Sequence, residues 1–330
     1  SQNKSYLRIL DAGTGDGTIK ANVIKSFHRY HPYTSLLITG KEISYEDLKN
    51  TLEKMPDRFV EHPNLLVTMT NVKFSELGLV ESATKINNKK IREFNLILKS
   101  DNSYDFNSQI TGNKLGNYIK KYWGIKIDNK GRTSYSNPCI IRIYREDNSR
   151  HLKQFLNNNY KNNNYDLIIA SQAYRAASTV KLKVNNVIGP LMRLLNKSGK
   201  LLVTHSYGGE SIQKVLKTAF KDKEAFPNKA KNIIDYLKNN PTGENNLYDY
   251  SNPVSYSFKF RKTPDQTVTE LFGHNVDAKW ANILYVGQIP EKDIQHLEKN
   301  TRLYNRVMKV IEKSGDIEFK NELFTITKIR

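Results

Sequence analysis

Cysteine is almost missing from this sequence, and long apolar runs are missing altogether. The single thiol, Cys139, has no second cysteine to pair with, which excludes an intramolecular disulfide and any thiolate-rich zinc or iron–sulfur site. No apolar run reaches the roughly 18 residues that cross a bilayer, and residues 1–10 contain no extended apolar stretch typical of a signal peptide. We therefore expect a soluble, cytoplasmic protein without a membrane partner.

Metal-binding patterns are missing as well. The sequence contains no HExxH motif and no cluster of paired carboxylates, so we expect no metal site.

Arginine is scarce relative to lysine. Lysine supplies 38 of the 52 cations and arginine 14, against 33 acidic residues, which gives a net charge of +19. A charge of this size favours an anionic partner such as nucleic acid. However, the lysines are spread along the whole chain together with 36 asparagines, a bias that AT-rich coding produces, whereas nucleic-acid binders concentrate arginine. Nucleic acid is therefore a possible partner, but the charge alone does not favour it.

Apolar residues make up 38% of the 330 positions, which is enough for a globular core in one large domain or two modest ones. Apolar runs at 6–10, 36–42 and 64–71 predict three strands, and amphipathic helices are expected between them. This alternation predicts a parallel sheet with helices on its faces.

The alternation returns after a long interruption. The runs at 165–174 and 200–206 predict a fourth and a fifth strand, again with a helix between them. Residues 72–164 are too many for a simple connection, so we predict an inserted subdomain. Its expected elements are strands at 93–100 and 139–146 and a helix at 112–125. Further strands are expected at 254–261, 281–289 and 323–329, with a helix from about Glu291 to Glu312 between the last two.

A glycine-rich turn joins the first strand to the helix that follows it. Gly13, Gly15 and Gly17 are spaced by two, so backbone atoms at this turn can approach a ligand closely. The dinucleotide fingerprint needs a glycine where Thr18 stands, and no GK[ST] follows as in a P-loop. Asp11 precedes the turn; its carboxylate would repel a pyrophosphate and suits a ligand that carries an ammonium group. A tight turn without a ligand is the alternative.

The segment LDAGTGDG at 10–17 resembles the first motif of the class I S-adenosylmethionine-dependent methyltransferases, and the order of the later strands agrees with that family. The match covers about half of the chain. The resemblance implies one α/β domain over 1–330 with a doubly wound, mostly parallel, seven-stranded Rossmann-like sheet. Residues 72–164 would be an accessory or lid subdomain inserted between the third and fourth strands.

The resemblance also implies where the cofactor, S-adenosylmethionine, binds. Asp11 and the backbone around the turn would hold its methionine end, Glu42 its ribose hydroxyls and Asn71 its adenine. The full set of cofactor-binding residues is then Asp11, Gly13, Thr14, Gly15, Gly17, Glu42, Asn71 and Ser171. Glu42 lies two residues past Gly40, and no aspartate stands beside Asn71, so both depart from the family pattern. For Glu42, a solvated turn is the alternative.

Residues that bind the methyl acceptor are expected where the fourth and fifth strands end. Here the sequence has Tyr174, Arg175 and His205, and we predict that these residues act on the acceptor. A guanidinium clamps a carboxylate with two hydrogen bonds, and an imidazole accepts a proton. As alternatives, Tyr174 and His205 are core residues, and Arg175 pairs with an internal carboxylate.

Two classes of acceptor follow. Enzymes of this fold that methylate base amines carry [DNS]PP[YFW] after the fourth strand, and SQAY at 171–174 lacks both prolines. We therefore expect a small polar or anionic metabolite, with 72–164 as a lid over it. The alternative is an RNA or protein methyltransferase that docks its substrate on the basic insertion. The sequence does not indicate the oligomeric state.

Overall fold

The structure of the chain is a computed structural model. It describes residues 6–80, 83–127, 133–148, 164–174, 176, 178–221, 225–239, 247–260, 280, 283–284, 287, 289, 291–314 and 317–330. The chain divides into two compact units, which are described in turn. The first comprises Ser1–Ser171, Ile188–Leu202 and Thr327–Arg330, and the second comprises Gln172–Val187 and Val203–Ile326.

Strands and helices alternate at the start of the first unit, as the sequence predicts. The strands are β1 (Tyr6–Ala12), β2 (Ser35–Lys41) and β3 (Leu65–Thr70), and the helices are α1 (Thr18–Tyr30), α2 (Tyr45–Glu53) and α3 (Pro56–Glu61). Ser44 fixes the start of α2, because its side chain accepts a hydrogen bond from the backbone N–H of Asp47 at 3.2 Å.

The rest of the first unit supplies shorter elements and four more long strands, the last of which continues into the second unit. They are η1 (Phe74–Leu79), β4 (Lys85–Ile86), β5 (Lys89–Lys90), β6 (Arg92–Leu98), α4 (Ser103–Ile110), α5 (Asn113–Tyr122), β7 (Ile125–Ile127), β8 (Thr133–Tyr135), β9 (Cys139–Arg145), β10 (Tyr165–Ser171), α8 (Gly189–Arg193) and the first part of β11 (Leu195–Gly208).

The main sheet of the first unit has the strand order β11-β10-β1-β2-β3-β9-β6. Strand β1 pairs in parallel with β10 and β2, and β2 pairs in parallel with β3, whereas β9 is antiparallel to β3 and parallel to β6. Read from β3 to β11, this is the 3-2-1-4-5 order of a doubly wound sheet, in which ligands bind beyond the carboxyl ends of the strands. The predicted α/β class with a mostly parallel sheet is therefore confirmed.

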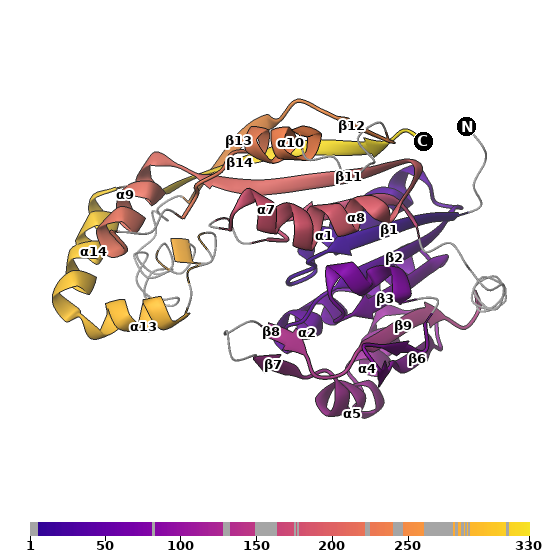
Figure 1. The fold of residues 1–330 in the computed structure, drawn as a ribbon. Helices are drawn as coiled ribbons and strands as arrows, with labels where there is room; N and C mark the ends of the chain where they lie inside the picture. The colour runs from indigo at the N-terminus through magenta and orange to yellow at the C-terminus, as the bar shows by residue number, and fades with distance from the viewer. Residues whose placement is uncertain are drawn as a thin grey trace. The chain divides into compact units, whose positions relative to one another are not determined.

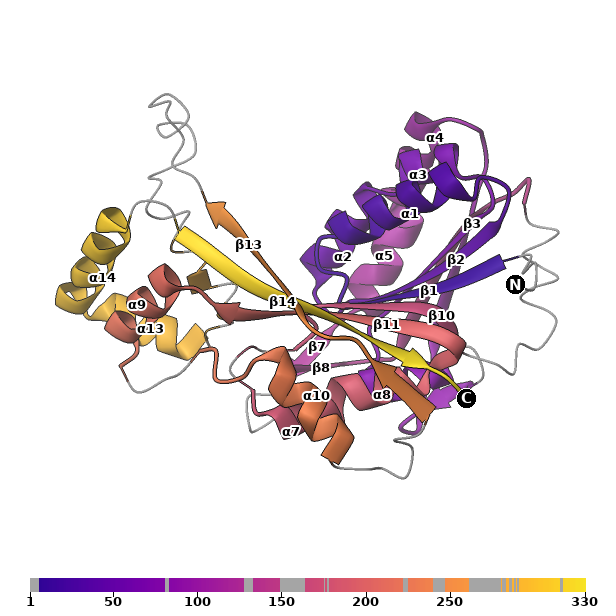
Figure 2. The same ribbon diagram turned by 90° about the horizontal axis from the view of Figure 1, so that it is seen from above.

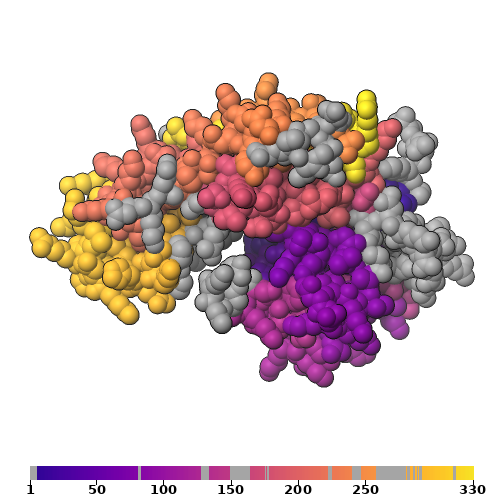
Figure 3. Space-filling view, in the orientation of Figure 1, coloured from indigo at the N-terminus to yellow at the C-terminus, as the bar shows by residue number. Residues whose placement is uncertain are grey.

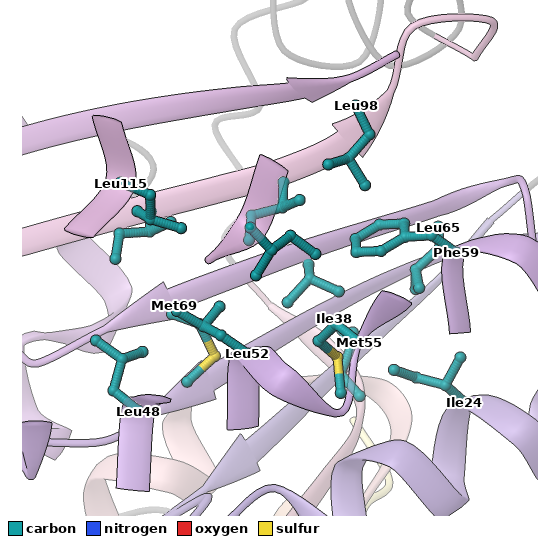
Figure 4. Close-up of a cluster of buried hydrophobic side chains, with 14 of the residues drawn as sticks. Ile24, Ile38, Leu48, Leu52, Met55, Phe59, Leu65, Met69, Leu98 and Leu115 are labelled. Carbon is teal, nitrogen blue, oxygen red and sulfur yellow. The ribbon is translucent and has the colours of Figure 1, made fainter. Parts of the chain in front are cut away.

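Helices cover both faces of this sheet. Figure 2 shows α1, α2 and α3 on one face and α8 on the other, and α8 lies in front of the sheet in the view of Figure 1. Under α1, α2 and α3 lies a buried apolar cluster, part of which appears in Figure 4, where Leu48, Leu52 and Met69 lie close together. Strands β1 to β3 are buried for most of their length, and little of the indigo first strand reaches the surface in the space-filling view (Figure 3).

The segment 72–164, which we predict to be an inserted lid subdomain, joins the main sheet in its described part, and its role as a lid stays a prediction. Its described part adds β6 and β9 to the main sheet beside β3, and its helix α5 packs Leu115 and Ile119 into the same apolar cluster as Ile24 of α1. Every residue of β9 is buried, and the strand has a paired neighbour on each edge, β3 and β6. The segment therefore widens the sheet.

The second unit contains α7 (Val180–Lys183), most of η2 (Val184–Ile188), α9 (Glu210–Ala219), α10 (Ala230–Asn239), β12 (Tyr248–Tyr250), β13 (Val254–Phe260), α13 (Glu291–Lys299), α14 (Thr301–Lys313) and nearly all of β14 (Ile317–Lys328), besides the end of β11. Its strands lie in the order β12-β14-β11, and β13 pairs antiparallel with β14. Its apolar cluster joins α9, α14 and β14.

Two expectations for the second unit can be compared with the structure. The predicted helix from Glu291 to Glu312 is present as α13 and α14, which are separated at Asn300, whose side chain accepts a hydrogen bond from Leu303 N–H at 3.1 Å. The structure differs from the prediction of a strand at 281–289, because the described residues 283, 284 and 287 of this range are helical. Among the helices that the structure describes, none combines the length and the apolar character needed to cross a membrane.

Candidate functional site

The glycine turn lies between β1 and α1, as predicted. Gly13, Gly15 and Gly17 have φ values of 93°, 55° and 80°, in the region that glycine adopts without the steric cost of a side chain. Thr14 anchors the turn to the neighbouring strand, because its backbone N–H donates to the carbonyl oxygen of Lys41 at 3.0 Å.

Two of these glycines meet different surroundings. A Cβ atom on Gly17 would lie 2.7 Å from the Cα atom of Thr51, so this glycine allows the turn to approach α2 closely. A Cβ atom on Gly15 would have no heavy atom within 4 Å, and the space in front of this residue is therefore open to a ligand. The hydroxyl of Thr51 donates to the carbonyl oxygen of Gly15 at 3.0 Å and holds the turn in this form.

Asp11 lies at the end of β1 and is almost completely buried, with 1% of its surface exposed. Its Oδ2 atom has no hydrogen-bond partner among the described residues. Burial raises the pKa of this carboxyl from 3.8 to about 6, although the ammonium of Lys20 and the hydroxyl of Thr14 act in the opposite direction. A buried carboxylate oxygen without a donor is costly, so this atom suits a ligand that brings a positive N–H group.

Lys20 is a functional candidate that the sequence patterns miss. It is fully buried on α1, and its Nζ atom lies 3.0 Å from the sulfur of Met69. Gly40 makes room for it, since a Cβ atom at that position would overlap Nζ. Burial lowers the pKa of Lys20 from 10.5 to about 8, while the carboxylates of Asp11 and Glu42 act in the opposite direction. Lys20 thus places a cation beside the two acids of the site.

Glu42 follows β2 and bonds to the glycine turn. Its Oε2 atom accepts a hydrogen bond from the backbone N–H of Gly15 at 2.9 Å, and its Oε1 atom accepts from the N–H groups of Ile43 and Ser44 at 2.7 and 2.8 Å. The solvated-turn alternative does not describe this residue, which is only 8% exposed. A carboxylate has about four acceptor sites, so Glu42 retains capacity to accept from a ligand hydroxyl.

Asn71 and Ser171 end the neighbouring strands. The Asn71 amide is used within the protein: its Oδ1 atom accepts from the N–H of Cys139 at 2.8 Å, and its Nδ2 atom donates to the carbonyl oxygen of Asn137 at 3.0 Å. A contact between Asn71 and adenine would have to share or displace these bonds, and the predicted role stays a prediction. Ser171 is the last residue of β10, two positions beyond Ile169, which pairs with Asp11.

In the second unit, the predicted acceptor residues Tyr174 and His205 lie together, with 6.0 Å between their ring centroids. Lys183, which the sequence patterns miss, has its Nζ atom 5.3 Å from the centroid of the Tyr174 ring and donates to the carbonyl oxygen of Ala176 at 2.8 Å. Burial raises the pKa of Tyr174 and lowers that of Lys183 to about 8. Arg175 lies outside the described residues.

Glu322, which the sequence patterns also miss, completes this cluster from β14. Its Oε2 atom lies 3.7 Å from Nε2 of His205 and accepts a hydrogen bond from the N–H of Ala230 at 2.6 Å. Burial lowers the pKa of His205, with a contribution from Lys183, against the attraction of Glu322. Among the described residues, neither ring nitrogen of His205 and not the hydroxyl of Tyr174 has a hydrogen-bond partner. A buried polar atom without a partner is costly, which makes this cluster a candidate for a functional role.

Among the residues that the structure describes, no group of three or more histidine, cysteine, aspartate and glutamate side chains could hold a metal ion.

No protein-family model and no curated protein matches the sequence. Among solved structures, the chain is similar to a protein of Galdieria sulphuraria named as a candidate sarcosine dimethylglycine methyltransferase, with 14% identity over 97% of this chain and 78% of that one and a TM-score of 0.38. For PKMT2 from Rickettsia typhi, the identity is 11%, the match covers 97% of this chain and 48% of that one, and the TM-score is 0.32. For the rRNA methyltransferase aviRa of Streptomyces viridochromogenes, the identity is 12%, the match covers 62% of this chain and 67% of that one, and the TM-score is 0.22.

Proposed function

We propose that the first unit binds S-adenosylmethionine and that the chain transfers the methyl group of this cofactor to a small polar or anionic acceptor. The observation that carries the proposal is the Oδ2 atom of Asp11, which is buried and has no donor among the described residues. It lies at the carboxyl end of β1, directly before the glycine turn. The ammonium of the methionine end supplies the missing positive N–H group, and the open space at Gly15 gives room for the ligand.

The other cofactor residues take roles that fit their chemistry. The backbone of Gly13, Thr14, Gly15 and Gly17 lines the methionine end, because a turn without side chains lets a ligand approach closely. Glu42 accepts from the ribose hydroxyls. Asn71 lies at the adenine, and Ser171 at the end of β10 completes the set. When bound, the cofactor supplies an electrophilic methyl group.

On the acceptor side, we assign His205 as the proton acceptor and Tyr174 and Arg175 as binding residues. A lowered pKa keeps the imidazole of His205 neutral near pH 7, and only the neutral form accepts a proton. Arg175 would clamp an anionic group of the acceptor.

Calorimetry tests the cofactor assignment. The full chain should bind S-adenosylmethionine and its demethylated product, S-adenosylhomocysteine. Asp11→Asn should reduce both affinities at least tenfold, because the isosteric amide loses the charge that attracts the ammonium. Glu46→Gln is the matched control, because Glu46 is exposed on α2 and its substitution also removes one negative charge. Undiminished affinity in Asp11→Asn, or no binding by the parent, contradicts the proposal.

A second experiment identifies the acceptor. The enzyme and methyl-labelled cofactor are incubated with a pool of small metabolites and, separately, with RNA. Label in a carboxylate-bearing metabolite supports the acceptor that we propose. RNA is the second candidate acceptor, and the observation that favours it is a groove on the first unit whose lining combines tyrosines with lysine and arginine. Label in RNA would replace the metabolite.

A further inference from the structure

A groove of about 400 Å³ lies on the first unit, away from the glycine turn in sequence. Its lining comprises Thr84, Lys90, Ile91, Arg92, Glu93, Tyr118 and Tyr122. These residues come from the short hairpin of β4 and β5, from the start of β6 and from α5. None of the residues assigned above to the cofactor or to the metabolite lines this groove.

The hairpin of β4 and β5 forms one wall of the groove and is held in place by contacts with η1 and the apolar core. Its turn residues Asn87 and Asn88 have φ values of 50° and 63°, as a tight two-residue hairpin turn requires. The side chain of Asn87 donates to Oε1 of Glu76 at 2.6 Å, which ties the hairpin to η1. Ile86 and Ile91 on either side are buried. The lysines of the hairpin are therefore carried on a preorganised support.

The opposite wall is aromatic. Tyr118 and Tyr122 lie one turn apart on α5, with 5.3 Å between their ring centroids. The Tyr118 hydroxyl donates to the carbonyl oxygen of Arg92 at 2.5 Å, which fixes the start of β6 against the helix. The guanidinium of Arg92 lies over the Tyr122 ring, 5.2 Å from its centroid, so the two planar groups form a stacked cation–π pair on this wall.

The lining carries an excess of positive charge. Among the described residues of the lining, Glu93 is the only acid, and its carboxylate forms an ion pair with Arg142 at 2.9 Å. Lys90 and Arg92 have no ion pair with a described residue. Lys121, beside Tyr122, adds a third cation at the rim, with its Nζ atom 5.1 Å from the Tyr122 ring centroid.

From this combination we infer that the groove binds a single-stranded segment of nucleic acid. Lys90 and Arg92 contact phosphates, and a base stacks on the surface formed by Tyr122 and Arg92. Proteins that bind single strands combine a positive groove with aromatic rings in this way, because every base has a face that stacks. An acidic peptide would use the cations alone and would leave the aromatic wall without a partner.

This inference does not depend on cofactor binding by the first unit. The groove is formed by residues other than those of the glycine turn. A failure to bind nucleic acid would therefore leave the cofactor assignment unchanged. Success of the inference would move RNA ahead of the small metabolite as the acceptor class.

Fluorescence anisotropy with labelled ten-nucleotide single-stranded RNA tests the inference on the full chain between 50 and 200 mM KCl, about the range over which phosphate contacts dominate the salt dependence. Tyr122→Leu should weaken binding about tenfold, since it removes one stacking surface, and Tyr122→Phe should bind like the parent. Lys90→Gln and Arg92→Gln should each lower the slope of log K against log salt by about 0.7.

Three controls decide the outcome. Lys114→Gln removes an exposed cation at the other end of α5 and should leave affinity unchanged; a loss equal to that of Lys90→Gln would show diffuse attraction and overturn the inference. Equal affinity for a duplex or for a ten-residue polyglutamate peptide would also overturn it, because neither offers an unstacked base. Circular dichroism of Tyr122→Leu checks that the variant folds. If it does not fold, Tyr122→Phe and Arg92→Gln carry the test. RNA binding by Tyr122→Phe that is weakened as much as in Arg92→Gln would contradict stacking.

Discussion

The carboxylate of Glu42 accepts a hydrogen bond from the backbone N–H of Gly15 at 2.9 Å, across 27 positions of the sequence. This bond ties the end of β2 to the middle of the glycine turn. The same carboxylate accepts from the N–H groups of Ile43 and Ser44 and so also fixes the path of the chain into α2. Glu42 therefore shapes the turn that Asp11 precedes, in addition to the ribose contact that we propose for it.

We predict that Glu42→Gln destabilises the first unit and weakens cofactor binding together. A glutamine has one acceptor oxygen where Glu42 uses two, so at least one partly buried N–H group loses its partner, at a cost of about 1 kcal/mol. Urea denaturation measures the stability and calorimetry the affinity for S-adenosylmethionine. Glu46→Gln on α2 is the control, and a Glu42→Gln variant as stable as that control would contradict this role.

Gly15 and Gly17 should respond differently to the same substitution. Gly15→Ala places its methyl group in open space, so we expect only the left-handed backbone cost of about 1–2 kcal/mol, but a large loss of cofactor affinity. Gly17→Ala drives its methyl group against the backbone of Thr51 and should be the more destabilising of the two. Thermal denaturation and calorimetry of both variants separate the effects. Full cofactor affinity in a folded Gly15→Ala would show that no ligand occupies this space.

The raised pKa of Asp11 predicts opposite pH dependences for stability and for binding. Between about pH 4 and pH 6, the folded chain keeps a proton that the unfolded chain has lost, so this group makes stability fall as the pH rises, by up to about 3 kcal/mol. Cofactor affinity should rise over the same window, because the ammonium binds the ionised carboxylate, and should level off above pH 6. Urea denaturation and calorimetry across this range should lose both trends in Asp11→Asn. Persistence of both in that variant would assign them to another group.

Much of the fold is predictable because apolar runs are local signals. The strands β1, β2, β3 and β10 follow directly from such runs, and the glycine turn follows from its spacing. The partner of a strand is a tertiary property, however, and nothing within the run 139–146 indicates that β9 joins β3. Helix α4 escapes the periodicity argument because only Phe106 and Ile110 of its residues are buried.

The candidate site is predictable only where a motif marks it. On α1, Ile19 is 40% exposed, whereas Lys20 is buried in line with Ile24 and Phe27, a position at which a hydrophobic pattern does not predict a lysine. Lys20 can be buried because the carboxylates of Asp11 and Glu42 attract its ammonium and because Gly40 leaves space for its side chain. These three residues lie on or directly after other elements, β1 and β2, so the sequence around Lys20 does not reveal them. Lys183 and Glu322 were likewise indistinguishable in the sequence from surface charges.

Arg175→Lys should raise the acceptor KM at least tenfold while leaving cofactor affinity nearly unchanged. The substitution keeps the positive charge but loses the planar fork that binds a carboxylate with two hydrogen bonds. Steady-state kinetics with the acceptor from the metabolite screen and calorimetry with the cofactor provide the two measurements. Methyl transfer at the parental KM would remove Arg175 from the acceptor site.

Glu322 should control the protonation of His205. Burial lowers the pKa of His205 and the nearby Glu322 carboxylate raises it, so Glu322→Gln should lower the His205 pKa further and slow methyl transfer by weakening the base. Because a neutral imidazole is the active form, the acidic limb of the pH–rate profile should move to lower pH. NMR titration of the His205 ring, assigned with His205→Gln, reports the same shift without any acceptor. Glu318→Gln, on the same strand and paired with Lys320, is the control. An unchanged His205 pKa in Glu322→Gln would restrict Glu322 to its hydrogen bond with Ala230 and leave His205 without a partner in proton transfer.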